Sequence, residues 1–247
     1  MKLSKILILF ILIVLPVNAN TIYNLIKIPN LKIYKNNSFN NLKYLTAKKP
    51  FQVGIRNDNV TCFNASINDI NQRYELIEKT LNQYSHNFLD KINLKYIVLC
   101  KDLSVSEINA AGVPNAKMKT LIIDINFNSK YFERVIHHEV FHIIHNSFQN
   151  IFLEKEWEKF NLDNFKYAEC STCSDRLDLE TIINTKGFFT EYSMSTASED
   201  MAEVFSFLMM RGEDLETNYE NDVILKNKIS FIKKNIKKID NKFSFGK

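Results

Sequence analysis

The stretch VIHHEVFHIIHNSF, Val135 to Phe148, is the feature that most restricts how this chain can fold, because it holds four of the five histidines. His138 and His142 flank Glu139 at the spacing His-Glu-x-x-His. On an α-helix, residues four apart lie above one another on one face, so both imidazoles can point at a single ion. The apolar residues between them would bury the other faces. The stretch therefore predicts a buried helix whose paired histidines face a cleft.

The same spacing predicts a metal site. Two histidines one helical turn apart suit zinc, and the glutamate after the first of them lies where it can hold and deprotonate a water molecule. We expect one Zn²⁺ per chain, with His138 and His142 as ligands and Glu139 as the general base. A core helix that is merely rich in histidine is the alternative. His137 and His145 are directed away from an ion between the pair, and we expect them to be hydrogen-bonded or surface histidines.

A catalytic zinc ion takes a third protein ligand and leaves its fourth position to water. The metzincin pattern places a histidine six residues after the motif, and it fails because Phe148 stands there. A later segment, STASEDMAEVFSFLMM, offers Glu199 and Glu203 on one face of a helix. We expect Glu199 to bind the metal and Glu203 to accept from the outer nitrogen of a histidine ligand; two solvent-facing acids are the alternative. Asp200 is expected only to favour the helix N-terminus.

The remaining pattern of apolar residues predicts an α+β fold, with a small mixed sheet, the motif-bearing helix and a mainly helical C-terminal part. The expected elements are a helix over 67–88, a strand over 93–100, a turn-rich loop over 108–117, a strand over 118–126, a helix over 128–147 capped by Asn128 or Ser129, a helix over 198–210 and a last helix over 221–240. Lysines on the last helix are expected to be solvated. With a formal charge of only +4 and no nucleic-acid motif, we expect no nucleic-acid partner.

The N-terminus, MKLSKILILFILIVLPVNAN, has the composition of a secretory signal peptide. Its apolar run, Ile6 to Leu15, has ten residues, about half of the ~20 that span a bilayer as a helix. Cleavage after Ala19 is therefore favoured over an uncleaved anchor. We expect residues 1–19 to be the signal peptide, and residues 20–247 to form a single secreted or periplasmic domain without stable membrane insertion.

Export favours disulfides over free thiols. The four cysteines, Cys62, Cys100, Cys170 and Cys173, allow three pairings. Because Cys170 and Cys173 lie close together in a polar stretch, we expect Cys170–Cys173 and Cys62–Cys100. A four-cysteine zinc site is less favoured, since the chain has one isolated C-x-x-C.

The His-Glu-x-x-His motif and the later Glu-x-x-x-Glu motif together resemble the gluzincin metallopeptidases. The closer resemblance is to the group of bacterial zinc-binding metallopeptidases that includes the catalytic domain of anthrax lethal factor. In that group a tyrosine precedes the glutamate ligand by seven residues, and EYSMSTASEDMAEVF places Tyr192 seven residues before Glu199. The resemblance covers Glu133 to Arg211. It implies a zincin-like fold, a peptide or protein substrate, and a hydrogen bond from Tyr192 to the oxyanion.

The expected function is therefore that of an exported zinc metallopeptidase. Two alternatives stay open: a non-catalytic zinc-binding or interaction protein on the same scaffold, and a zinc hydrolase that acts on a non-peptide amide. The intact Glu139 argues against the first, because a structural zinc site usually fills all four positions and has no use for a base. The resemblance also implies that an edge strand beside the motif helix binds substrate, and this is either the strand over 118–126 or its neighbour.

Overall fold

The computed structural model describes residues 31–35, 38–55, 58–182, 185–212, 215, 219 and 221–246. The expected signal peptide, residues 1–19, lies outside the described residues. Within the part that is described, no helix combines the length and the apolar character needed to cross a membrane.

The strands of the described residues form one mixed sheet around a long central strand. They are β1 (Leu31–Lys35), β2 (Lys43–Ala47), β3 (Phe51–Ile55), β4 (Asp58–Phe63), β5 (Tyr96–Val105), β6 (Ile108–Asn109), β7 (Gly112–Asn115) and β8 (Thr120–Asp124). The central β5 pairs in parallel with β2 and β8, and antiparallel with β4 and β6. On the far side of β8, β7 adds an antiparallel strand. The mixed sheet is thus confirmed.

The sequence of β5 explains how the sheet is covered on both faces. Side chains alternate along a strand, so Ile97 and Leu99 face the helices, whereas Val98 and Cys100 face a second core built with β4. This two-sided burial is why β5 begins as an almost continuous apolar run. The disulfide between Cys62 and Cys100 ties β4 to β5 inside the second core.

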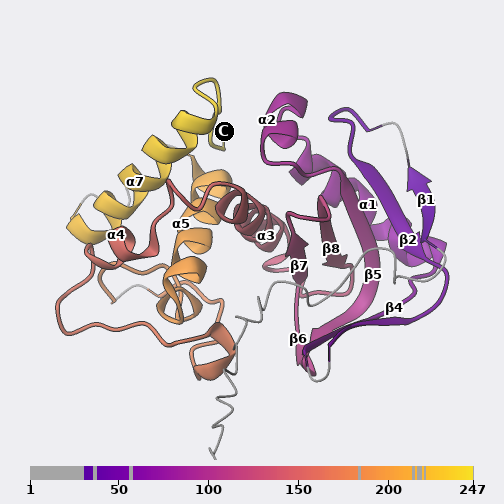
Figure 1. Cartoon of the computed structure of the whole chain (residues 1–247), viewed down its shortest axis with the longest axis horizontal. Helices are drawn as coiled ribbons and strands as arrows, with labels where there is room; N and C mark the ends of the chain where they lie inside the picture. Colours follow the sequence, from indigo (N-terminus) through magenta and orange to yellow (C-terminus); the bar gives the residue numbers. More distant parts are fainter. Residues whose placement is uncertain are drawn as a thin grey trace, which may run out of the picture.

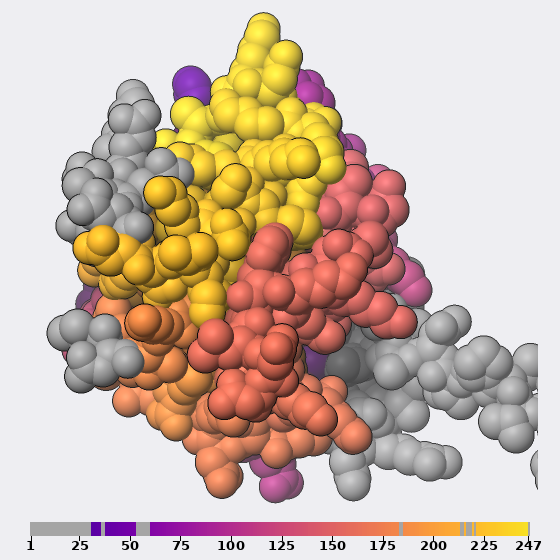
Figure 2. All heavy atoms as spheres, turned by 90° about the vertical axis from the view of Figure 1, so that its left-hand side faces the viewer, coloured from indigo at the N-terminus to yellow at the C-terminus, as the bar shows by residue number. Residues whose placement is uncertain are grey.

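The helices gather mostly in the C-terminal half. They are α1 (Ile67–Leu81), α2 (His86–Lys91), α3 (Phe132–Ser147), α4 (Glu154–Glu158), α5 (Ala197–Arg211) and α7 (Val223–Ile239), with 3-10 turns η2 (Ser171–Cys173) and η3 (Tyr192–Met194). Figure 1 shows α3 between the sheet on one side and α5 with α7 on the other. In Figure 2, α7 lies along the segment that contains α4. The α+β class and the mainly helical C-terminal part are confirmed.

Several expected boundaries are wrong, among them that of the strand over 93–100, which runs from Tyr96 to Val105. The helix over 67–88 is two helices, because the backbone turns after α1 and Ser85 caps α2. The loop over 108–117 contains β6 and β7. Neither Asn128 nor Ser129 caps α3, which starts after Tyr131 without a side-chain cap; Asn128 Oδ1 instead accepts from the backbone N–H of Lys130 at 3.0 Å.

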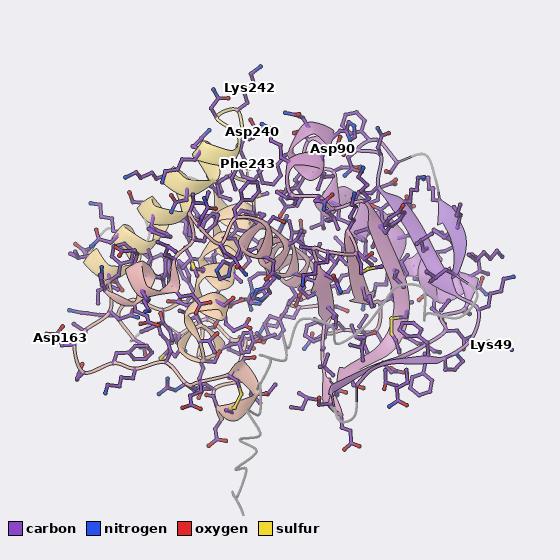
Figure 3. The ribbon with its side chains drawn as sticks, viewed as in Figure 1. Lys49, Asp90, Asp163, Asp240, Lys242 and Phe243 are labelled. Atoms are coloured by element: carbon purple, nitrogen blue, oxygen red, sulfur yellow. A yellow bond between two sulfur atoms is a disulfide. The ribbon has the colours of Figure 1, made fainter. Side chains whose placement is uncertain are left out.

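The ends of the helical half are held by specific contacts. Thr196 caps α5 by accepting from the backbone of Glu199, and Gly212 ends that helix at φ 55°. After α7, Phe243 packs on Phe88 of α2 with ring centroids 4.5 Å apart, and Figure 3 shows Phe243 at the end of the molecule where α2 lies. Both expected disulfides, Cys62–Cys100 and Cys170–Cys173, are present.

Candidate metal centre

Helices α3 and α5 bring the three expected ligands together. His138 and His142 lie one turn apart on α3, with their Nε2 atoms 3.0 Å from each other. Glu199, in the first turn of α5, places its Oε2 2.9 Å from Nε2 of His138 and 3.1 Å from Nε2 of His142. Among the described residues these three form a group of donor atoms that could hold a metal ion, all within 4.8 Å of one another.

The chemistry of these donors fits a zinc ion. His138 donates from Nδ1 to Glu203 at 2.9 Å, so loss of the proton on Nε2 would leave that nitrogen with a lone pair for a cation. That lone pair points at a carboxylate oxygen of Glu199 and at the Nε2 of His142, and a cation satisfies all three groups at once. The observed separations are close to the roughly 3.3 Å between ligands bound tetrahedrally at zinc–nitrogen and zinc–oxygen distances of about 2.0–2.1 Å.

The electrostatics of the cluster also favour a cation. Burial by itself lowers the pKa of His138, but Glu199 and Glu203 accept hydrogen bonds from its ring and raise that pKa to about 10. Burial would raise the pKa of Glu199, yet the neighbouring His142 and His138 hold it well below its usual range. Two carboxylates, Glu203 buried and Glu199 mostly buried, thus flank the His138 ring, and positive charge between them is favourable whether the protonated ring or a bound cation carries it.

Glu203 fixes the orientation of the His138 ring. Its other oxygen, Oε2, accepts hydrogen bonds from Arg134 and, at 2.8 Å, from Thr190 Oγ1. Arg134 also donates to the backbone oxygen of Leu179 at 2.7 Å. A carboxylate held in this way sets the tautomer of the histidine and makes it a better ligand. Sequence reasoning missed Arg134 and Thr190; Arg134 lies four residues before His138 on one helix face, a spacing that could have revealed it, whereas Thr190 gives no signal.

Glu139 faces the cleft and lies against β7. Burial raises its pKa to about 7, with the two histidines lowering it and Glu199 raising it. A Cβ atom placed on Gly112 would lie only 2.6 Å from Cγ of Glu139. Only glycine therefore allows β7 to approach this carboxylate so closely. Sequence reasoning missed Gly112, because the stretch around it has the composition of a turn.

Tyr192 lies beside the cluster, in the 3-10 turn η3. Its ring centroid is 5.7 Å from that of His138, and its hydroxyl group interacts with the Glu199 carboxylate. Burial, followed by the charges of Glu199 and Glu139, raises its pKa well above the ordinary value. The phenol therefore keeps its proton and can act as a hydrogen-bond donor.

The neighbouring histidines of α3 make other contacts. His137 pairs through Nδ1 with the Tyr84 hydroxyl at 2.6 Å. His145 contacts the Ser198 hydroxyl at 3.2 Å and the backbone oxygen of Phe152 at 3.1 Å. Burial lowers the pKa of His137 to about 3 and that of His145 to about 4, so both rings stay neutral. Neither belongs to the donor group.

The expectation for Asp200 is wrong. Rather than only favouring the N-terminus of α5, Asp200 is completely buried and forms an ion pair with Lys228 of α7, N to O 2.6 Å. Lys228 is itself completely buried, which corrects the expectation that the lysines of this helix are solvated.

A cleft of about 540 Å³ opens onto Glu139, His142 and Glu199. One wall is built by β6, β7 and the turn between them, and the other by the segment that carries the Cys170–Cys173 disulfide. Its other lining residues are uncharged, and most are apolar. The charged groups of the cleft thus lie at the donor cluster itself.

The edge strand beside this cleft is β7, not β8. Among the described strands, β7 pairs with β8 alone, while β8 lies between β7 and β5. The backbone N–H of Asp124 donates to the backbone oxygen of Ala111 at 2.9 Å. In this antiparallel register the backbone groups of Gly112 and Pro114 therefore point away from β8. An unpaired strand edge of this kind can accept an extended peptide.

Residues 82–245 match the family described as “Putative zinc-binding metallo-peptidase”. Among solved structures, the chain is similar to a “putative zinc-binding metallo-peptidase from Bacteroides caccae ATCC 43185”, with 18% identity, 69% of each chain covered and a TM-score of 0.43. No curated protein matches the sequence.

Proposed function

The chain belongs to the “putative zinc-binding metallo-peptidase” family, and from this premise we propose that it is a zinc-dependent peptidase with Glu139 as its general base. The observation that carries the proposal is the convergence of His138, His142 and Glu199 at one point, with the Glu139 carboxylate facing the same cleft. A purely structural site would have no use for a buried carboxylate beside an open position.

In this proposal His138, His142 and Glu199 hold one zinc ion per chain. Zinc bound there would polarise a peptide carbonyl and lower the pKa of a water molecule toward ~7. Glu139 orients that water, accepts its proton during attack on the carbonyl carbon, and then passes the proton to the leaving amine. The protonated Tyr192 donates a hydrogen bond to the carbonyl oxygen as negative charge develops on it.

The cleft and its edge strand support binding of the peptide substrate in an extended form. Gly112 and Pro114 point their backbone groups toward the unpaired edge of β7, so an extended substrate can pair with that edge next to Glu139. Because Pro114 has no N–H, only its carbonyl oxygen is available for a backbone hydrogen bond with such a substrate. The uncharged walls favour substrates whose side chains near the cleaved bond are neutral and mainly apolar.

Export is part of the proposal. The composition of residues 1–19 supports it, as does the pairing of all four cysteines, which is typical of proteins in oxidising compartments. N-terminal sequencing of protein recovered outside the cytoplasm tests it, and a retained Met1 would refute cleavage after Ala19.

The direct test of the function is digestion of an unbiased peptide library by the purified protein, with and without a chelator, together with measurement of bound zinc. We expect about one zinc per chain and cleavage that stops with chelation and returns when zinc is added. Protein that is loaded with zinc but cleaves no peptide would contradict the proposal. It would favour a zinc-binding protein without peptidase activity or a hydrolase of another amide, which assays with non-peptide amides would separate.

Replacing Gly112 with alanine is expected to lower kcat about tenfold to a hundredfold while zinc content stays unchanged. The added methyl group would collide with Glu139, and displacing a reacting group by about 1 Å can cost on the order of 10²-fold. Kinetics and metal analysis of the same sample measure both quantities. Ala110→Gly, in the same wall, is the control; equal kinetics of Gly112→Ala and wild type would show that the close approach is dispensable.

Replacing Tyr192 with phenylalanine is expected to reduce kcat by about 10- to 1000-fold with little change in KM. The lost hydroxyl would donate to charge that develops only in the transition state, and one such donor is worth up to ~10³-fold. Steady-state kinetics on a peptide from the library measures the effect. A rise in KM at constant kcat would instead assign Tyr192 to substrate binding.

A further inference from the structure

A buried ion pair lies directly behind the candidate metal centre. Asp200 follows Glu199 in the first turn of α5 and is completely buried. Its Oδ2 accepts from three donors on other parts of the chain: Trp157 Nε1 at 2.8 Å, the Tyr167 hydroxyl at 2.6 Å and Lys228 Nζ at 2.6 Å. One carboxylate oxygen thus joins α5 to α4, to the segment after it, and to α7.

The lysine of this pair is held as tightly as the aspartate. Lys228 Nζ also donates to the backbone oxygen of Gly187 at 2.7 Å, and it lies 3.8 Å from the centroid of the Phe188 ring. Its side chain is 0% exposed. The ammonium group therefore contacts only other residues of this chain. It is not accessible to solvent, to a substrate or to a partner.

Stability alone does not account for such a pair. Desolvation of two charges offsets most of their attraction, and buried pairs can often be replaced by apolar residues of similar volume without loss of stability. The pair instead constrains the geometry, because each donor must approach Asp200 at a fixed distance and angle. The rotation of the first turn of α5 is thereby fixed relative to α4 and α7.

The position of the Glu199 carboxylate depends on the rotation of this turn. Consecutive residues of a helix are about 100° apart around its axis, so a twist or slide of this turn moves Asp200 and Glu199 together. On the side of the centre, Glu203 holds α5 through His138, Arg134 and Thr190. The N-terminal part of α5, which carries Glu199, is thus held on two of its faces.

We propose that Asp200 and Lys228 are positioning residues for Glu199: their buried ion pair sets the first turn of α5 so that the Glu199 carboxylate meets His138 and His142. The inference rests on the proposed function only in taking Glu199 as a metal ligand. It concerns affinity for the metal, which can be measured without any peptidase assay.

The test uses the double variant Asp200→Leu/Lys228→Met. It removes one charge of each sign, so the net charge near the centre is unchanged and long-range attraction for zinc is preserved. Zinc affinity is measured by competition with a chelator, the geometry of the centre by the visible spectrum of the Co²⁺-loaded protein, and folding by thermal unfolding of the metal-free protein. The matched control is Ile236→Ala, a buried core residue of α7 away from the pair.

We expect the double variant to fold with an unfolding temperature at or near that of the wild type. Its zinc affinity should fall about tenfold to a hundredfold, the range seen when groups that orient a ligand are lost, and its Co²⁺ spectrum should change. Ile236→Ala should unfold at lower temperature but bind zinc within about twofold of wild type, since cavity formation costs stability without moving Glu199.

A folded double variant with wild-type zinc affinity and Co²⁺ spectrum would overturn the inference. Should that variant not fold, Asp200→Asn/Lys228→Met keeps an acceptor for Trp157 and Tyr167 but removes the link to α7; unchanged zinc affinity and Co²⁺ spectrum in that variant would overturn the role of the ion pair. Wild-type protein that binds no zinc would refute the proposed function instead, so the two failures are distinct.

Discussion

Replacing Glu139 with glutamine is expected to stop peptide cleavage while zinc stays bound. Glutamine has nearly the same shape, so the contact with Gly112 is kept, and Glu139 is not one of the three donors that converge at the centre. The amide cannot take a proton from the attacking water. Loss of a general base costs about 10²- to 10⁴-fold, which we expect in kcat/KM for any peptide found in the library digestion.

Two measurements make this result specific. Metal analysis should return the same zinc content as for the wild type, and the unfolding temperature should not fall. Glu133→Gln is the matched control, since Glu133 lies in the first turn of the same helix and outside the cleft, and its replacement removes the same charge. Sustained cleavage by Glu139→Gln would place the base elsewhere, and loss of zinc would mean that Glu139 contributes to the binding of the metal.

The spacing of residues on helices made the centre predictable. His138 and His142 on one helix, and Glu199 and Glu203 on another, are each four apart, and four residues on an α-helix always return to the same face. No assumption about the sheet is needed for either pair. That the two pairs meet was inferred from the need of zinc for a third ligand, and the structure brings them together.

The edge strand could not be predicted, because its pattern is ambiguous. Gly112 and Pro114 in AAGVPNAK are typical of a turn, and proline is excluded from the interior of a sheet. In the structure Pro114 is tolerated because its nitrogen faces the unpaired edge of β7 and no ladder bond is lost. The hairpin of β7 with β8, and the packing of α3 on β7 from farther along the chain, give Gly112 its role.

For Lys228, by contrast, the sequence does contain a signal of burial, and the expectation of a solvated residue overlooks it. Lys228 lies three residues after Leu225 and four before Ile232, which are both buried. The helical period therefore places Lys228 within the apolar stripe of α7. Charge alone suggested a solvated residue, but a lysine on a buried face requires an acidic partner, and Asp200 is that partner.

Replacing His142 with alanine is expected to remove the metal and, with it, all cleavage. One of three protein ligands is lost, and the cavity left by the ring offers no other nitrogen, because His145 is engaged with Ser198 and the Phe152 carbonyl. The loss of affinity should exceed the roughly 10- to 100-fold that removing a partner of a ligand costs. Zinc content after dialysis against a weak chelator should fall from about one per chain to near zero.

The control for this experiment lies on the same helix. His145→Ala removes an equally buried imidazole that is outside the donor group, so it should keep its zinc even if it lowers stability. Circular dichroism of both variants shows whether α3 has survived. If His142→Ala is folded and retains full zinc, α3 is only a histidine-rich core helix; if it alone loses the metal, the spacing of His138 and His142 is a ligand spacing.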